Sequence, residues 1–384
     1  MQLEWLVFPG WACLAASVAG LLYLAVSVYA VRILLVRPRR NGTATPITVL
    51  KPLRGADAGL YENLRSFCQQ TYTPFQIVFG VVDADDPAVS VVRRLIAEFP
   101  ALDLVLVTGS AARAPNRKVA NLMNMLPAAR YGQLAISDSD MRVTSDYLAT
   151  IAPLLAAPDV GLVTCLYRGM PAGNNFWSRV ACLHINHGFF PEAAVGELLH
   201  AGDGAFGATL ALSRANLDAI SGLAAIADRL ADDHALGAAV RHLGRQVVLA
   251  PVIVDNIVFE SGLGALFRHE LRWARTVRMV APAGYAGSVI THPVALAILA
   301  VLIHPVAWSF YGLIAAILAR FGTVWLNDRA LGLRRTPVYL VLLRDGLSFA
   351  VFVASFFAQS VAWRDRRYRI AAGGRLTLDG DSSV

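Results

Sequence analysis

The sequence predicts a doubly wound α/β domain that lies between apolar segments long enough to cross a membrane. Between residues 37 and 278, strand-like and helix-like patterns alternate along the chain. Aspartates follow two of the buried strand patterns directly, at Asp83 and Asp138. Runs without charged residues lie on both sides of this region.

The composition places the chain at a bilayer. Of its 384 residues, 56% are apolar and 16% charged, which is too hydrophobic for a soluble protein of this size. Leu6–Val31 carries no charge and suits one crossing, and Met279–Ala319 suits one tilted helix or a tight pair. Val338–Trp363 is a third candidate, interrupted by Arg344-Asp345. The first run is long and Glu4 precedes it, which argues against a cleaved signal peptide.

These runs predict four segments, which are a transmembrane helix (1–36), an α/β domain (37–278) that includes an interfacial helix (265–278), a membrane region (279–363) and a basic tail (364–384). The first run is followed by the arginines Arg32, Arg37, Arg39 and Arg40. By the positive-inside rule, they put the large domain in the cytoplasm and the N-terminus outside. The arginines of the tail (Arg364, Arg366, Arg367 and Arg369) put the tail in the cytoplasm as well. In that compartment the four cysteines need not form disulfides, and their spacing matches no metal site.

Arginine accounts for the positive charge. The net charge is +7, and all but two of the 34 basic residues are arginines. Many of them flank the apolar runs, so anionic lipid headgroups are the expected partners. No aromatic-interleaved basic surface favours nucleic acid.

The elements of the domain follow from hydrophobic spacing. Period-two or continuous apolar runs predict strands, and spacing of three to four predicts helices. The expected strands are Ile47–Leu50, Ile77–Val82, Asp103–Val107, Leu134–Ile136, Gly161–Leu166 and Gly207–Leu212. The expected helices are Leu60–Gln69, Val89–Phe99, Lys118–Leu126, Phe176–Phe189 and Leu230–Leu243.

Two acidic clusters fall at the carboxyl ends of predicted strands, where open α/β sheets bind ligands. Asp138 and Asp140 suit Mg or Mn bridged to a diphosphate, or else stabilise a turn. Asp83 suits hydrogen bonds to a base or ribose, or else lies in a solvated loop. Lys118, at the start of a helix, suits a diphosphate.

Two further motifs complete the candidate chemistry. Asp232-Asp233 offers a general base, or a helix cap. On the helix after residue 265, His269, Arg272 and Trp273 share a face. Arg272 suits a leaving diphosphate and Trp273 suits packing beside a sugar or acceptor, or else the helix only anchors at the interface. The remaining histidines form no metal set and are interpreted as structural.

Taken together, these motifs resemble family 21 glycosyltransferases, the ceramide glucosyltransferase family, and most of all its bacterial, hopanoid-biosynthesis-associated branch. The matching segments are Val49–Gly55, Asp83–Pro87, Lys118–Leu122, Asp138–Asp140, Gly161–Gly169, Phe206–Thr209, Leu230–Leu236, Arg268–Arg275 and Trp363–Arg369. The resemblance implies a GT-A fold with a mixed, mainly parallel sheet. It also implies inverting transfer from a UDP-sugar to a lipid hydroxyl, at a bacterial inner membrane.

The resemblance assigns roles residue by residue. Asp83, Asp138 and Asp140 serve the nucleotide-sugar, with Mg or Mn on the last two, and Asp233 is the base. Lys51, Lys118 and His269 are expected to bind the nucleotide-sugar, and Arg272 and Trp273 are expected in catalysis. His269 stands where the family has Gln or Arg.

Several functions remain open at this point. The acceptor is a hopanoid or ceramide, and the sugar is N-acetylglucosamine or glucose, with the hopanoid and N-acetylglucosamine favoured by the resemblance. A processive polysaccharide synthase would need more helices after residue 278. A transporter or scaffold would be favoured by Arg344 and Asp345 in an apolar run, although a mutual ion pair explains these two equally well.

Overall fold

The computed structural model describes residues 4–38, 45–109, 111–201, 205–357, 360–363, 366–371 and 375–378. The chain divides into two compact units. The helical unit comprises Met1–Val36, Arg179–Ala201 and Glu260–Asp365, and the α/β unit comprises Arg37–Ser178, Gly202–Phe259 and Arg366–Val384. Two segments that the sequence analysis places in the α/β domain, residues 179–201 and 260–278, therefore cluster with the apolar helices.

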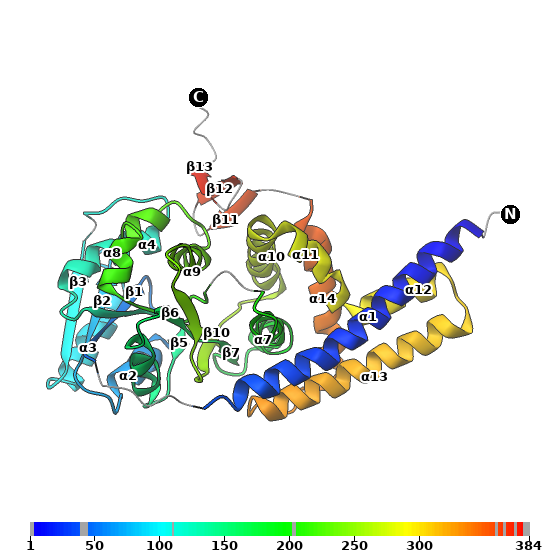
Figure 1. Ribbon diagram of the computed structural model, residues 1–384, viewed down its shortest axis with the longest axis horizontal. Coiled ribbons are helices and arrows are strands. Elements are labelled where there is room, and N and C mark those ends of the chain that lie inside the picture. The colour runs from blue at the N-terminus through cyan, green and yellow to red at the C-terminus, as the bar shows by residue number, and fades with distance from the viewer. Residues whose placement is uncertain are drawn as a thin grey trace. The chain divides into compact units, whose positions relative to one another are not determined.

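A seven-stranded sheet forms the α/β unit, with the order β3-β2-β1-β4-β8-β6-β9. Figure 1 labels its strands β1, β2, β3 and β6. The strands are β1 (Ile47–Leu53), β2 (Phe75–Val81), β3 (Asp103–Thr108), β4 (Gln133–Ile136), β6 (Val160–Thr164), β8 (Leu210–Ser213) and β9 (Gln246–Leu249). Only β8 runs antiparallel to its neighbours, β4 and β6. The expected mixed, mainly parallel sheet is confirmed.

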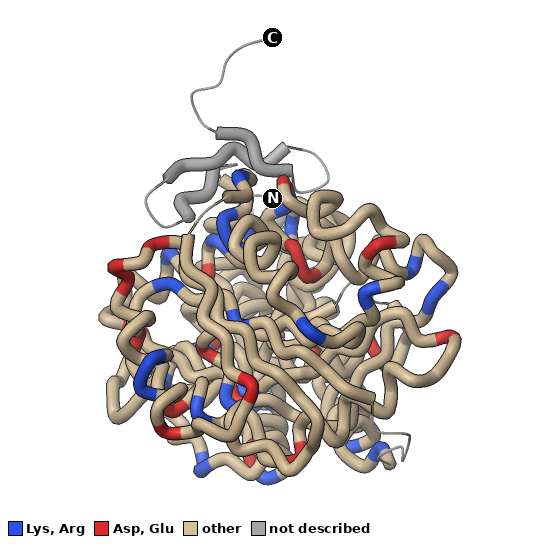
Figure 2. Tube along the Cα trace, turned by 90° about the vertical axis from the view of Figure 1, so that its left-hand side faces the viewer, with Lys and Arg blue, Asp and Glu red and all other residues tan. Residues whose placement is uncertain are grey.

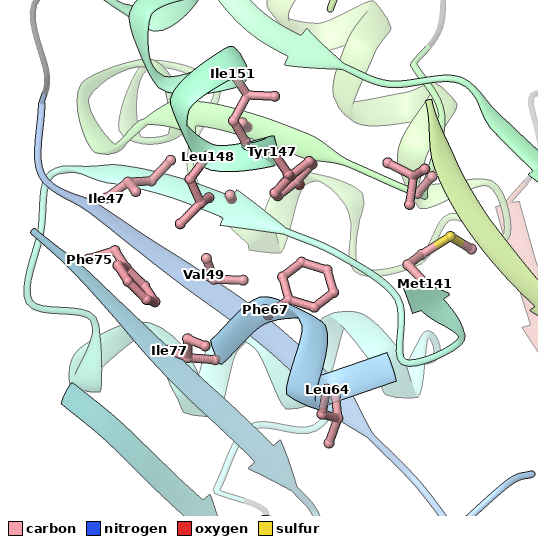
Figure 3. Packing of buried hydrophobic residues seen from close by; sticks show 14 of the residues in the cluster. Ile47, Val49, Leu64, Phe67, Phe75, Ile77, Met141, Tyr147, Leu148 and Ile151 are labelled. Carbon is pink, nitrogen blue, oxygen red and sulfur yellow. The ribbon is translucent and has the colours of Figure 1, made fainter. Parts of the chain in front are cut away.

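Helices cover both faces of this sheet because alternate strand residues point to opposite faces. On one face, α2 (Leu60–Cys68) and α5 (Tyr147–Leu155) bury an apolar cluster with the strands (Figure 3). Phe67 and Tyr147 meet there edge to face, with ring centroids 5.6 Å apart. On the other face, Leu50 packs with residues of α4 (Arg117–Met125) and α9 (Asp232–His242). The remaining helices of this unit are α3 (Ala88–Glu98) and α8 (Arg214–Ala219).

A second, smaller sheet was not expected from the sequence. It has the order β5-β10-β7, with β5 at Met141–Arg142, β10 at Val254–Val258 and β7 at Tyr167–Pro171. These strands are short and have no apolar alternation that could reveal them. The sheet joins the segment after Asp140 to the segment around Asn256. Farther on, β12 (Arg366–Ala371) pairs antiparallel with β13 (Arg375–Leu378).

In the helical unit, α1 (Glu4–Leu35), α12 (Pro293–Ile303) and α13 (Ala307–Ala330) run side by side (Figure 1). Among the described residues, three helices are long and apolar enough to cross a membrane, at Val7–Leu35, Ala307–Ala330 and Val338–Ser355. The segments Pro282–Thr291 and Pro293–Ile303 form a pair bent by 71°. The third helix, α14, lies within the predicted run Val338–Trp363.

The helix expected at Phe176–Phe189 is confirmed as helical, and its last turn differs from a regular α-helix: α6 (Phe176–His184) is followed by a π-helix, η2 (Ile185–Phe189), and by α7 (Phe190–Leu198). The start of one predicted strand was wrong. The strand expected from Gly207 begins at Leu210, because the preceding residues form a turn closed by Thr209 N–H to the Phe206 carbonyl at 3.2 Å. The predicted interfacial helix is α10 (Leu263–Val280). Figure 2 shows basic and acidic positions interspersed along the chain trace.

Candidate functional site

The carboxyl ends of β1, β2 and β4 meet at one edge of the main sheet, because these strands are parallel neighbours. Asp83 follows the end of β2 by two residues, and Asp138 follows the end of β4 by two residues. Asp83 is exposed, and its Oδ1 accepts a hydrogen bond from Asp85 N–H at 3.0 Å. Both aspartates therefore lie at the expected edge, where α/β sheets bind ligands.

Lys118 joins the acidic cluster of Asp138 and Asp140 to that of Asp232 and Asp233. Its Nζ lies 2.7 Å from Asp138 Oδ1 and 3.0 Å from Asp232 Oδ2. Burial alone would lower the pKa of Lys118, but Asp138 and Asp232 outweigh it and raise that pKa. The lysine is positioned by Asn116, which caps α4 by accepting from the N–H groups of Lys118 and Val119. A single ammonium thus holds together two carboxylates that are far apart in the sequence.

Asp233 is the second residue of α9 and follows Asp232 of this ion pair. Its Oδ2 accepts from Gly207 N–H at 3.0 Å, and its Oδ1 from His234 N–H at 2.8 Å. Burial, followed by the charge of Asp232, raises the pKa of Asp233 to about 6, against the opposing effect of Lys118. A carboxylate with a pKa this close to neutrality suits a general base.

Gly207 marks the space between two of these carboxylates. A Cβ at this position would lie 3.1 Å from Asp138 Oδ2 and 3.3 Å from Asp233 Oδ2. Both oxygens therefore border the same small volume, which any side chain at residue 207 would fill. The sequence predicted Asp138 and Asp233 as site residues, and the structure brings them together here.

Asp140 is held from the small sheet. Its Oδ2 accepts from Asn256 Nδ2 at 2.9 Å, and its main-chain carbonyl accepts from Ile257 N–H at 2.8 Å. Asp140 is exposed, yet desolvation by the surrounding atoms, followed by the charge of Asp138, raises its carboxyl pKa to about 6. The two carboxylates of this motif therefore repel each other.

The residues could hold a divalent cation only with help from a ligand. Among the described residues, no group of three His, Cys, Asp or Glu side chains could hold a metal ion. Asp138 and Asp140 nevertheless fit Mg or Mn, which bind proteins through one or two carboxylates and take their other oxygens from substrate phosphates and water. A cation bound by these two aspartates would relieve the repulsion between them.

Lys51 lies beneath the same loop and is fully buried. Its Nζ donates to the main-chain carbonyl of Asp138 and, at 3.3 Å, to Ser137 Oγ, and it lies 3.9 Å from the centre of the Phe67 ring. Burial lowers the pKa of Lys51 to about 7. The side chain therefore supports the backbone of the Asp138 loop, and its predicted contact with a nucleotide-sugar stays a prediction.

Tyr167 is a site residue that the sequence analysis missed. It lies on β7 opposite Val254 of β10, and Gly169 lies opposite Asn256. Because alternate strand residues share a face, the Tyr167 side chain leaves the small sheet on the same face as Asn256, which holds Asp140. Burial, followed by the charges of Asp233, Asp140 and Asp138, raises the pKa of its phenol. The only signal in the sequence is its place just after a buried strand.

Asp86 belongs to the acidic cluster that begins at Asp83, and the sequence assigned it no role of its own. Both of its carboxylate oxygens accept from Gly55 N–H, at 2.8 and 2.9 Å, and Oδ1 accepts from Ala88 N–H at 2.9 Å. Gly55 adopts a φ of +72°, a conformation that favours glycine. Asp86 therefore ties the loop after β1 to the loop after β2, at the edge where Asp83 lies.

In the helical unit, Trp273 lies between two histidines. The ring centroids of His269 and Trp273 are 4.3 Å apart, and His184 stacks on Trp273 at 6.4 Å with an interplanar angle of 24°. His269 is itself held by Glu260, with Nδ1 and Oε1 2.6 Å apart. The sequence analysis interpreted His184 as structural and did not pick out Glu260. The helix face shared by His269 and Trp273 is observed.

Arg344 and Asp345 do not form the mutual ion pair considered in the sequence analysis. Arg344 donates to both carboxylate oxygens of Glu270, at 2.6 and 2.7 Å. Asp345 accepts from Arg320 Nε at 2.9 and 3.0 Å. Adjacent residues on a helix point about 100° apart, so these two side chains diverge and find different partners.

Comparisons with known proteins agree with this arrangement. A family model described as glycosyl transferase family 21 matches residues 12–376. Ceramide glucosyltransferase 1 of Caenorhabditis elegans is 22% identical over 385 residues, covering 96% of this chain and 81% of that protein. Beta-monoglucosyldiacylglycerol synthase of Trichormus variabilis is 24% identical over 161 residues, covering 40% and 34%.

A solved structure shares the fold. A mannosyltransferase of Pyrobaculum calidifontis, determined in complex with GDP-Man and Mn²⁺, superposes with a TM-score of 0.55. It is 22% identical, and the match covers 92% of this chain and 99% of that one. The expected GT-A type of fold, with apolar helices in both terminal regions, is therefore confirmed.

Proposed function

The chain belongs to glycosyl transferase family 21, and we propose that it transfers a sugar with inversion from a UDP-sugar to the hydroxyl of a membrane lipid. The observation that carries the proposal is the junction of three acidic side chains around Lys118 and Gly207. Asp138 and the adjacent pair Asp232-Asp233 come from separate parts of the sequence, yet they meet at the carboxyl edge of the sheet.

Asp233 is the general base of the proposed reaction. Its carboxylate takes the proton of the lipid hydroxyl while that oxygen forms a bond to the anomeric carbon. The bond from this carbon to the diphosphate breaks at the same time, and UDP leaves. Attack on the face opposite the leaving group inverts the anomeric centre. The hydrogen bonds from Gly207 and His234 orient the base and leave its raised pKa within reach of neutral pH.

Mg or Mn would be held by Asp138 and Asp140 together with oxygens of the diphosphate, and it would neutralise charge on the leaving group. Lys118 contributes a second positive charge beside Asp138. Lys51 orients the main chain of that loop from below. Asp83, at the neighbouring strand end, is proposed to bind the nucleoside. The roles of His269, Arg272 and Trp273 in sugar transfer follow from the family resemblance and stay predictions.

The acceptor is proposed to be a hopanoid lipid, and the sugar N-acetylglucosamine or glucose. Ceramide is the second candidate, because the ceramide glucosyltransferase of C. elegans aligns with nearly the whole chain. The T. variabilis relative is named for the synthesis of a glucosylated diacylglycerol, which also supports a lipid acceptor. We propose further that the enzyme resides in a bacterial inner membrane, with its α/β unit in the cytoplasm and anionic lipid headgroups around its arginines.

One experiment separates these alternatives. The purified full-length protein is offered UDP-glucose or UDP-N-acetylglucosamine together with a hopanoid, ceramide or diacylglycerol, with and without added Mg²⁺ or Mn²⁺. Mass spectrometry of the lipids then identifies the product. A mass increase on one lipid class, dependent on the divalent ion, is the expected result. If no lipid gains a sugar and no UDP-sugar binds, the proposed function is wrong.

A further inference from the structure

The inference concerns Arg344 and Asp345, two adjacent charged residues in the apolar helix α14. We propose that they position Trp273 by separately fixing the two elements that hold its indole ring. One element is α10, which carries Trp273 and His269. The other is the end of α6, which carries His184. The proposed function enters only through the consequence for sugar transfer.

The first contact fixes α10. Arg344 forms a bidentate ion pair with Glu270, and the two side chains are only 2% and 3% exposed. Arg344 Nε also donates to Ser348 Oγ at 3.0 Å, which holds the guanidinium on its own helix. Glu270 precedes Trp273 by three residues, so both lie on one side of α10. The planar guanidinium of Arg344 restrains the Glu270 carboxylate in direction as well as in distance. The ion pair therefore fixes the rotation of α10 about its axis and its position along α14.

The second contact fixes the segment after His184. Asp345 pairs with Arg320 of α13, and Arg320 Nη1 donates to the carbonyl of His187 at 3.1 Å. His187 lies in the π-helix, where the wider turn disrupts the regular α-helical bonding. Its Nε2 lies 3.1 Å from Asp328 Oδ1, a second restraint on the same turn. His184 directly precedes this turn and stacks on Trp273.

The energetics favour positioning over stabilisation. Burying an ion pair costs desolvation that the Coulomb attraction only partly returns, so apolar residues of similar volume often give equal or greater stability. A buried pair that adds little stability still specifies one geometry, because either charge left unpaired is costly. In α14 the two adjacent charges face two different elements. Arg344 reaches α10 directly, and Asp345 reaches the segment after His184 through Arg320 of α13.

The experiment uses the full-length protein labelled with 5-fluorotryptophan. Of the seven tryptophan signals in its ¹⁹F spectrum, the one absent from Trp273→Phe belongs to Trp273. The double variant Glu270→Leu/Arg344→Met removes the first contact, and Asp345→Leu/Arg320→Met removes the second. Arg344→Lys keeps the charge but loses the fork. The matched control is Ser355→Ala, also in α14, which removes the hydrogen bond that Ser355 Oγ accepts from the Tyr285 hydroxyl.

We expect each double variant to shift or broaden the Trp273 resonance, with a thermal midpoint within about 4 °C of the parent. The turnover number should fall about 10- to 100-fold, since small displacements of a positioned group have effects of this size. Arg344→Lys should give an intermediate shift, and Ser355→Ala should leave the resonance and the turnover unchanged.

The outcomes distinguish the two proposals. If a double variant folds with an unmoved Trp273 resonance and parental turnover, the ion pairs are only structural and the inference is wrong. If the double variants do not fold, an unmoved resonance in Arg344→Lys overturns it equally. If the resonance shifts as expected but the parent transfers no sugar to any lipid, the positioning stands and the proposed function fails.

Discussion

The single positive charge of Lys118 decides how the neighbouring carboxylates differ. The ammonium contacts Asp138 and Asp232, whereas the oxygens of Asp233 accept from main-chain N–H groups. The charge of Asp232 is therefore balanced by direct contact with Lys118. Asp233 differs: burial and the charge of Asp232 raise its pKa, and Lys118 lowers it only from a longer distance. Two adjacent aspartates thus acquire different chemistry from their surroundings alone.

Replacing the proposed base should remove catalysis without removing the donor site. Asp233→Asn is expected to lower the turnover number about 10²- to 10⁴-fold, the usual contribution of a general base. UDP-sugar binding, measured by calorimetry, should change little. Asp228→Asn, a half-exposed aspartate five residues earlier, serves as the control. Full transfer activity in Asp233→Asn would show that another group takes the proton.

The raised pKa of Asp233 sets the direction of the pH dependence. The base works in its ionised form, so activity is present above the pKa of about 6 and is lost as the pH falls through it. The turnover number, followed from pH 8 to pH 5 with folding checked by circular dichroism, should decline on the acid side. A constant rate down to pH 5 in folded protein would contradict the assignment.

Tyr167 should contribute through its hydroxyl. The phenol interacts with the charges of Asp233, Asp140 and Asp138, and its raised pKa keeps it a neutral hydrogen-bond donor. Tyr167→Phe is expected to reduce the turnover number about tenfold, because hydrogen bonds to charged groups contribute about 1.5–3 kcal/mol. Tyr72→Phe, which removes another tyrosine hydroxyl that bonds Thr45 in the same unit, should leave it unchanged. Equal activity of both variants would exclude Tyr167 from the reaction.

At this scale the sequence revealed the acidic residues but not what holds them. Asp138 and Asp233 could be predicted because carboxylates after buried strands and at helix starts form recognisable local patterns. Tyr167 and Asn256 could not, because their importance comes from contacts with residues far away in the chain. No spacing in the sequence records such contacts.

At the scale of elements, the N-cap of α4 positions Lys118, which lies in the first turn of that helix. Asn116 is fully buried, accepts two N–H groups of the first turn, and donates to the carbonyl of Arg229 at 2.8 Å. It therefore connects the start of α4 to the segment that leads into Asp232. The single side chain of Asn116 thus restrains both the start of α4 and the segment before Asp232.

Asn116→Ala should lower both stability and activity. The lost cap is expected to reduce the free energy of unfolding by about 1–2 kcal/mol. Because Lys118 lies in the same turn, sugar transfer should also fall. Ser213→Ala removes the cap of α8, where the side chain accepts from Asn216 N–H at 3.1 Å, and should reduce stability while leaving transfer intact. Denaturant unfolding and transfer assays compare the two, and parallel losses of transfer would contradict a special role for Asn116.

Long periodic elements were predicted well, and short or irregular ones were not. The runs behind β1, β2 and α3 carry enough apolar residues at regular spacing to be recognised. The strands β5 and β7 and the π-helix have no such pattern. They form because backbone groups find partners in distant segments, as β7 does with β10.

At the scale of the whole molecule, the apolar helices predict the topology. We expect the N-terminus outside, the α/β unit and the C-terminal tail in the cytoplasm, and at least one crossing after residue 285. A reporter that works only in the cytoplasm should be active when it is fused to the tail, and a reporter that works only in the periplasm should be inactive there. A fusion after residue 40 serves as the cytoplasmic control. A tail reporter active only in the periplasm would contradict the predicted orientation of the tail.

The sequence by itself determined the class of fold, the apolar segments and the acidic clusters, because each depends on residues that are close together in the chain. The tertiary structure alone decided which charges pair. Lys118 contacts both Asp138 and Asp232, and Arg344 and Asp345 turn away from each other to different partners. Local spacing sets secondary structure and the side on which a residue lies, whereas ion pairs and ring contacts depend on how separate elements pack.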